Sequence, residues 1–174
     1  MKNFIRFLIV VLLMVSYTSC DEIDKLTEVD INTTLNEQLD ATVPAGKDLA
    51  VSNTMSIDMV NSDTERYLDV LQSVRITSFR YELTNFTGDS NGTITGNFVA
   101  DGIELLSHDM VVKQIVDAGT VFEVTNAAQL SAMASKLKAG KDILIGLVGT
   151  SNCNETMNFT ANITIELEIT ADVL

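Results

Sequence analysis

The chain has 174 residues, of which 46% are apolar, and a formal net charge of −13 at pH 7. Residues 1–19 are far richer in apolar side chains than the rest, of which about 43% is apolar, a typical value for one folded domain. Without Lys2 and Arg6 the formal charge of that remainder is −15. Nucleic acids and anionic lipid surfaces attract cationic proteins, so this charge argues against both as partners. A chain of this size also needs no metal or disulfide to stabilise it, and we expect no cofactor.

The first predicted element is a signal peptide over residues 1–19. Lys2 and Arg6 provide a positive start, Phe7 to Val15 form an unbroken apolar run, and small polar residues lead to Cys20. The apolar run is about half of what a stable membrane-spanning helix needs, so a removable signal is favoured over a permanent span.

This arrangement resembles the signal of bacterial lipoproteins. In that family the cysteine thiol is diacylated and the chain is cut just before it, which implies a lipid on Cys20 that holds the protein to a membrane. Tyr17-Thr18-Ser19 replaces the usual Leu-Ala-Gly run, and relaxed versions with Ser before the Cys are common in Bacteroidota-type lipoproteins. The alternative is an ordinary secretory signal whose cleavage site lies near a cysteine.

Residues 20–25 form an acidic tether. Asp21, Glu22 and Asp24 directly follow Cys20, and such a cluster resembles the surface-export signal of Bacteroidota lipoproteins. The resemblance implies a protein anchored in the outer membrane and exposed at the cell surface rather than facing the periplasm. A solvated tether in a generally acidic chain is the simpler interpretation.

Alternating apolar residues predict most of the remaining elements. Residues 29–43 and 53–59 show the period of two that is typical of strands with one buried face. Residues 74–86 alternate with a slip of one at Ser78, which predicts a β-bulge. Asn91-Gly92 then favours a tight hairpin turn, with residues 93–99 as the returning strand.

Further strands are expected at residues 102–107 and 142–148. The last run, 157–173, alternates strictly over 17 residues and forms a hairpin with 142–148 through a polar turn around Cys153. At about 3.3 Å per residue it exceeds 50 Å, so we expect a bend or bulge within it, or an edge that runs past the sheet.

Two short helices interrupt the strands. Ser62 and Glu65 have capping-box spacing and predict a helix that ends near Gln72. A stripe of apolar residues predicts a second helix over 126–139, ended by Gly140. A helical turn over 113–118 is a weaker expectation.

These elements predict a mainly β protein, with residues 26–174 as a single antiparallel β-sandwich of about eight strands. The main rival is an eight-stranded outer-membrane barrel. The absence of Trp leaves it without aromatic girdles, and the helix over 126–139 is of the soluble type.

No motif for catalysis emerges. His108 is the single histidine; its neighbour Asp109 points to the opposite face of a strand, so we expect a surface or strand-end histidine. Cys153 is expected as an incidental turn thiol without a nearby cation to activate it. Residues 89–93 faintly resemble a calcium loop but fit a hairpin turn better. Six asparagines begin Asn-x-Thr triplets and are expected on the wet faces of strands and turns: Asn32, Asn85, Asn91, Asn154, Asn158 and Asn162.

The predicted function is that of a small lipid-anchored envelope protein, a non-catalytic binding or structural module for an envelope protein or a glycan. Its resemblance to Bacteroidota-type surface lipoproteins rests on the segment around Cys20. Two alternatives stay open: a glycosidase-like hydrolase with strand-borne carboxylates, and a periplasm-facing accessory subunit of an envelope complex.

Overall fold

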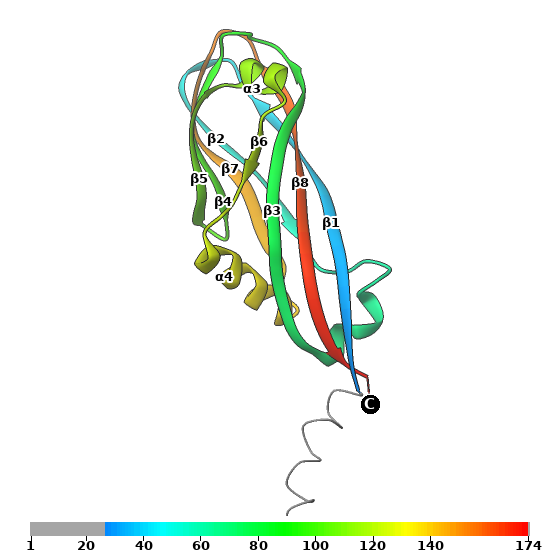
Figure 1. Cartoon of the computed structure of the whole chain (residues 1–174). Coiled ribbons are helices and arrows are strands. Elements are labelled where there is room, and N and C mark those ends of the chain that lie inside the picture. Colours follow the sequence, from blue (N-terminus) through cyan, green and yellow to red (C-terminus); the bar gives the residue numbers. More distant parts are fainter. Residues whose placement is uncertain (1–26, 174) are drawn as a thin grey trace, which may run out of the picture.

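The computed structural model describes residues 27–173, which form two four-stranded antiparallel sheets packed face to face (Figure 1). The predicted β-sandwich of eight strands is confirmed. The predicted signal peptide, Cys20 and the acidic tether lie outside the described residues, as does Leu174. The strands are β1 (Glu28–Val43), β2 (Gly46–Ile57), β3 (Leu71–Thr87), β4 (Thr93–Ala100), β5 (Ile103–Val111), β6 (Val121–Glu123), β7 (Ile143–Cys153) and β8 (Met157–Asp172).

The strand order defines the topology. Sheet A has the order β1-β8-β3-β6 and sheet B the order β2-β7-β4-β5. Successive strands mostly alternate between the sheets, and within residues 27–173 only β4 and β5 are consecutive strands paired with each other. This double-sheet order of eight strands is that of a jelly roll.

Both predicted hairpins are wrong. The Asn91-Gly92 turn joins β3 of sheet A to β4 of sheet B, and the chain after Cys153 likewise leaves sheet B for β8 of sheet A. Alternation shows which side of a strand faces the core. It does not show whether two successive strands pair within one sheet or lie in two facing sheets, because both arrangements bury the same side chains. The true hairpin turns at Asp101-Gly102, whose positive φ angles of 52° and 78° suit a two-residue turn.

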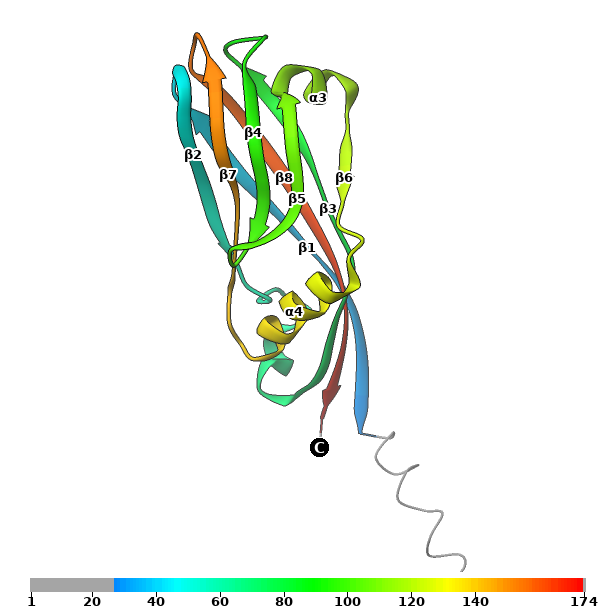
Figure 2. The same cartoon turned by 90° about the vertical axis from the view of Figure 1, so that its left-hand side faces the viewer.

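The last strand, β8, lies at the centre of sheet A. Its register with β1 is unbroken from Glu28↔Asp172 to Val43↔Met157. The expected irregularity lies instead in its other neighbour, β3, where the register shifts at three places. One shift falls between Ile76 and Ser78, which confirms the bulge predicted from the slip in alternation. The segment 157–173 was expected to bend or to form an edge that runs past the sheet. Instead β8 is a long, central strand between β1 and β3 (Figure 2).

The core lies between the two sheets and consists of the inward apolar residues of the alternating strands. On β8, Ile163, Ile165 and Leu167 are almost completely buried. Facing strands add aromatic rings, and the rings of Tyr81 and Phe98 stack with centroids 4.0 Å apart. Full burial contributes about 1.5–3 kcal/mol for each large apolar side chain, so this layer dominates the stability of the sandwich.

Three helical elements lie in the connections: η1 (Glu65–Val70), α3 (Val112–Ala118) and α4 (Ala127–Lys138). The predicted second helix is confirmed as α4, whose N-cap Asn126 accepts hydrogen bonds from the backbone N–H groups of Ala128 and Gln129. The weaker helical turn is also confirmed, as α3, and Gly119 ends it in a left-handed conformation.

The first predicted helix is wrong in type and extent. It is the short 3-10 helix η1, and the chain from Leu71 onward already pairs with β8. The Thr64 hydroxyl donates to the Met59 carbonyl instead of capping the helix. Pairing with a central strand satisfies more backbone groups than another helical turn would.

The two ends of the sandwich differ. β1 begins and β8 ends as paired neighbours, so both termini of the described chain leave from the same end, near η1 (Figures 1 and 2). We call it the terminal end. The β1–β2, β3–β4 and β7–β8 connections and α3 lie at the opposite end, which we call the loop end. Within residues 27–173, no helix has the length and apolar character needed to cross a bilayer.

Candidate binding site at the loop end

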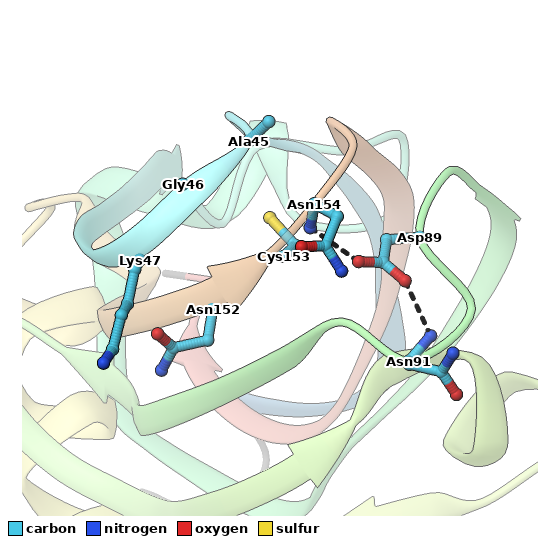
Figure 3. Close-up of a pocket in the computed structure, with 8 residues that line it drawn as sticks. All are labelled: Ala45, Gly46, Lys47, Asp89, Asn91, Asn152, Cys153 and Asn154. Carbon is cyan, nitrogen blue, oxygen red and sulfur yellow. Dashed lines mark hydrogen bonds between the residues drawn. The ribbon is translucent and has the colours of Figure 1, made fainter.

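A polar pocket of about 560 Å³ lies at the loop end, between the β1–β2, β3–β4 and β7–β8 connections (Figure 3). Its polar lining combines one carboxylate, one ammonium group and three asparagine amides. The lining residues are Ala45, Gly46, Lys47, Asp89, Asn91, Asn152, Cys153 and Asn154.

Asp89 holds two of these connections together. Its Oδ2 accepts a hydrogen bond of 2.6 Å from the backbone N–H of Asn154, and its Oδ1 accepts one of 2.9 Å from the N–H of Asn91. These hydrogen bonds, that from Asn154 first, lower the pKa of the Asp89 carboxyl. The carboxylate therefore stays ionised at neutral pH and fixes one wall of the pocket.

Gly88 permits this close approach. Its φ is 109°, and a Cβ atom there would meet the Thr156 carbonyl oxygen at 2.1 Å. The β3–β4 connection can therefore pack onto the β7–β8 connection only with glycine at this position.

A bulge at the start of β2 sets the opposite wall. The register with β7 shifts between Lys47 and Leu49, and the intervening Asp48 has a φ of 53°. The Asn152 side-chain oxygen accepts a 3.0 Å hydrogen bond from the Asp48 N–H and stabilises this conformation. Lys47 is exposed and belongs to none of the four ion pairs found in residues 27–173. Its ammonium group is thus available to a ligand.

Cys153 is not the turn thiol that its polar sequence neighbours suggested. It is the last residue of β7, it is buried, and its Sγ lies 3.3 Å from the Pro44 carbonyl oxygen. Strand pairing continues through the polar residues before it, because Ser151 and Cys153 point inward while Asn152 points outward. The residue contributes to the lining of the pocket from the end of β7.

The geometry of the pocket suits hydrogen bonding to a polar ligand. Asparagine amides both donate and accept, and Asp89 and Lys47 add a fixed acceptor and a mobile donor. Glycoside hydrolysis needs two carboxylates across the scissile bond, whereas Asp89 is the one carboxylate in the pocket lining. Within residues 27–173, no cluster of three His, Cys, Asp or Glu side chains could hold a metal ion. The 89–93 segment is a connection between sheets rather than the hairpin expected for it.

His108 lies in a second cluster, away from the pocket. It points inward between the sheets, where its Nε2 forms a hydrogen bond with the Tyr81 hydroxyl and its ring lies 4.5 Å from that of Phe122. The expectation of a surface or strand-end histidine is therefore wrong. Asp109 does point the other way, as predicted, and accepts a hydrogen bond from Thr95. Burial lowers the pKa of His108 and raises that of Tyr81.

The sequence did not identify this cluster because its members come from β3, β5 and β6, which are far apart along the chain. The sequence did offer one sign that His108 points inward, because it continues the alternation of Leu106 and Met110. The asparagines of the Asn-x-Thr triplets are on strand faces and turns, as predicted. Asn32, Asn85, Asn91, Asn154 and Asn158 are exposed, and Asn162 is half-buried.

Comparison with known proteins gives only distant likenesses in structure. No protein-family profile matches the chain, and no curated protein does. The decameric BFDV capsid protein is 11% identical, with a TM-score of 0.47 over 81% of this chain and 99% of that one. A mud crab dicistrovirus protein is 13% identical (TM-score 0.42, 83% and 72%), and one from Desmodium yellow mottle tymovirus is 12% identical (0.36, 83% and 84%). The jelly-roll assignment rests on the strand order itself.

Proposed function

We propose that the protein is a lipid-anchored, non-catalytic binding module of the bacterial cell envelope, held at the outer membrane by acylated Cys20. The observation that carries this proposal is the placement of the pocket and the chain termini at opposite ends of the sandwich. From Cys20 to the start of β1 at Glu28 the chain can extend at most about 28 Å. An anchor on Cys20 would therefore keep the terminal end near the bilayer and present the loop-end pocket outward.

The pocket favours a hydroxyl-rich ligand such as the exposed sugars of a glycan. Its amides, carboxylate and ammonium group can exchange several hydrogen bonds with neutral hydroxyl groups. A partner of strong negative charge is disfavoured, because the protein itself carries a large negative charge. A protein partner would use the same end, with polar loop residues forming the contact.

Membrane fractionation of cells tests the anchor. The Cys20→Ala variant should leave the membrane fraction and appear as soluble protein, because its chain has no thiol to acylate at that position. Cys153→Ala is the matched control and should stay in the membrane fraction, since that thiol is buried in the fold. Membrane association of the Cys20→Ala variant would contradict the lipid anchor.

Titration of the secreted Cys20→Ala protein with neutral mono- and disaccharides, followed by backbone amide NMR shifts, tests the pocket. The shifts should concentrate at residues 45–47, 89–92 and 152–154, and Asn91→Ala should weaken binding by about fivefold, the value of one hydrogen bond. Asn36→Ala, on the outer face of sheet A, should leave binding unchanged. Shifts spread over the sheets, or none with any sugar, would contradict a glycan site at the loop end. Release of a sugar product would instead favour the hydrolase.

A further inference from the structure

The outer face of sheet B carries almost no charge on three of its four strands, and the exposed Glu104 and Asp109 lie on the edge strand β5. β4 and β7 contain no charged residue, and β2 contains none after Asp48. Figure 2 looks onto this sheet. Its outward side chains are Ala50, Ser52, Thr54 and Ser56 on β2, Leu144, Val148, Thr150 and Asn152 on β7, and Thr93, Thr95, Asn97 and Val99 on β4.

The outer face of sheet A is built in the opposite way. Charged residues extend across it, among them the ion pairs Arg75–Glu168 and Arg80–Glu166. Several of its other polar side chains form hydrogen bonds across the strands, for example Thr160 to Asp40 at 2.8 Å. Sheet A thus has a charged outer face, many of whose polar side chains already have cross-strand partners.

Nothing in the described chain covers the face of sheet B. Ser52, Thr54, Thr95 and Thr150 are exposed, and Leu144 keeps half of its surface accessible to solvent. On the middle of this face an exposed Leu lies among small, uncharged residues, so two proteins can bury that part without desolvating a charge.

We propose that this face binds a second copy of the chain, in a two-fold symmetric dimer with the two B sheets packed face to face. Two copies repel each other through their net charge, so they approach with the least cost through a face whose three strands β2, β7 and β4 carry no charge beyond the start of β2. Four strands about 4.8 Å apart and about 30 Å long give a flat area of about 600 Å² per copy, the lower limit for a specific interface.

Charge at the two edges of the face fixes the direction of the axis. β2 and β5 are the edge strands of sheet B, with Lys47 on the first and Asp109 on the second, both exposed. Lys47 pairs with Asn152, which pairs with Thr93 of β4 on its other side, and Thr95, two residues along β4, pairs with Asp109. Lys47 and Asp109 therefore lie at similar heights on opposite edges of the sheet. A two-fold axis parallel to the strands places β2 of one copy over β5 of the other, so each Lys47 approaches the other copy's Asp109.

The same axis keeps both terminal ends on one side of the dimer. Two copies anchored in one membrane require this orientation, and this step alone rests on the proposed lipid anchor. The dimer itself does not depend on the anchor or on the loop-end pocket.

Sedimentation equilibrium of the full chain, extracted in a density-matched detergent, tests the dimer with two matched variants. Thr150→Glu introduces a charge at the centre of the sheet B face, and Thr164→Glu introduces the same charge on the central strand of sheet A. We expect the wild type and Thr164→Glu to dimerise alike, and Thr150→Glu to dimerise at least about tenfold more weakly, because like charges then oppose across the interface.

Rescue separates loss of the interface from loss of the fold. A mixture of Thr150→Glu and Thr150→Lys should recover the dimer that Thr150→Glu alone loses. A wild type that stays monomeric at every concentration, equal dissociation constants for the two Glu variants, or a mixture that does not recover would overturn the proposal.

Discussion

The inward position of His108 has a thermodynamic consequence. Burial lowers the pKa of its imidazole in the folded state, so the unfolded chain, with an ordinary pKa near 6.5, binds the proton more tightly. The burial of Tyr81 raises the pKa of its phenol, which therefore stays protonated and can donate to the neutral imidazole. Protonation of His108 removes that acceptor. The stability that the neutral imidazole contributes is thus complete above the unfolded pKa near 6.5, and it is lost as the pH falls from there through the lowered pKa of the folded state, where the native pair breaks.

Urea unfolding at a series of pH values should show this dependence. We expect the free energy of unfolding of the wild type to decrease as the pH falls from 7.5 toward the lowered pKa of His108. His108→Gln keeps a polar side chain without a titrating group, so its free energy of unfolding should be flat over the same range. Asp89 does not interfere, because its pKa is lowered and it titrates at more acidic pH. Parallel curves for the two proteins would show that His108 is not buried as described.

At the scale of elements, the strands were predictable because a period of two needs only local sequence. The predicted strand over 29–43 agrees with β1, and the slip at Ser78 correctly located a bulge. The second strand was expected over 53–59, whereas β2 begins at Gly46. Its first half has a single buried apolar residue, Val51, because Leu49 is exposed beside the bulge at Asp48.

Strand partners were not predictable in the same way. The sheet to which a strand belongs depends on contacts far along the sequence, as between β1 and β8. The two residues of a tight turn are the local exception, and Asp101-Gly102 was a signal for the one true hairpin that the sequence analysis did not use. The loop-end pocket was not predictable because it assembles three connections, although its Asn91 and Cys153 were considered singly.

At the scale of the whole molecule, the two ends and the two faces have separate roles in the proposed assembly. The loop end has the polar pocket, the terminal end leads to Cys20, and the sheet B face is free for a second copy. The anchor uses a different part of the surface from the other two roles, whereas the pocket and the sheet B face meet at Lys47 and Asn152. The long axis must then stand away from the membrane, with β8 contributing about 50 Å of length at 3.3 Å per residue.

Energy transfer to a membrane dye, measured on the acylated protein in vesicles, tests this upright orientation. A fluorophore on Asn91→Cys, at the loop end, should show weak transfer, because it would lie about 50 Å farther from the bilayer than the terminal end. The same fluorophore on Asp63→Cys, just before η1, should show strong transfer. The buried Cys153 should not compete for the label, and unsubstituted protein checks this. Equal transfer from the two positions would mean that the sandwich lies flat on the membrane, which would bring one face, rather than the terminal end, against the lipid.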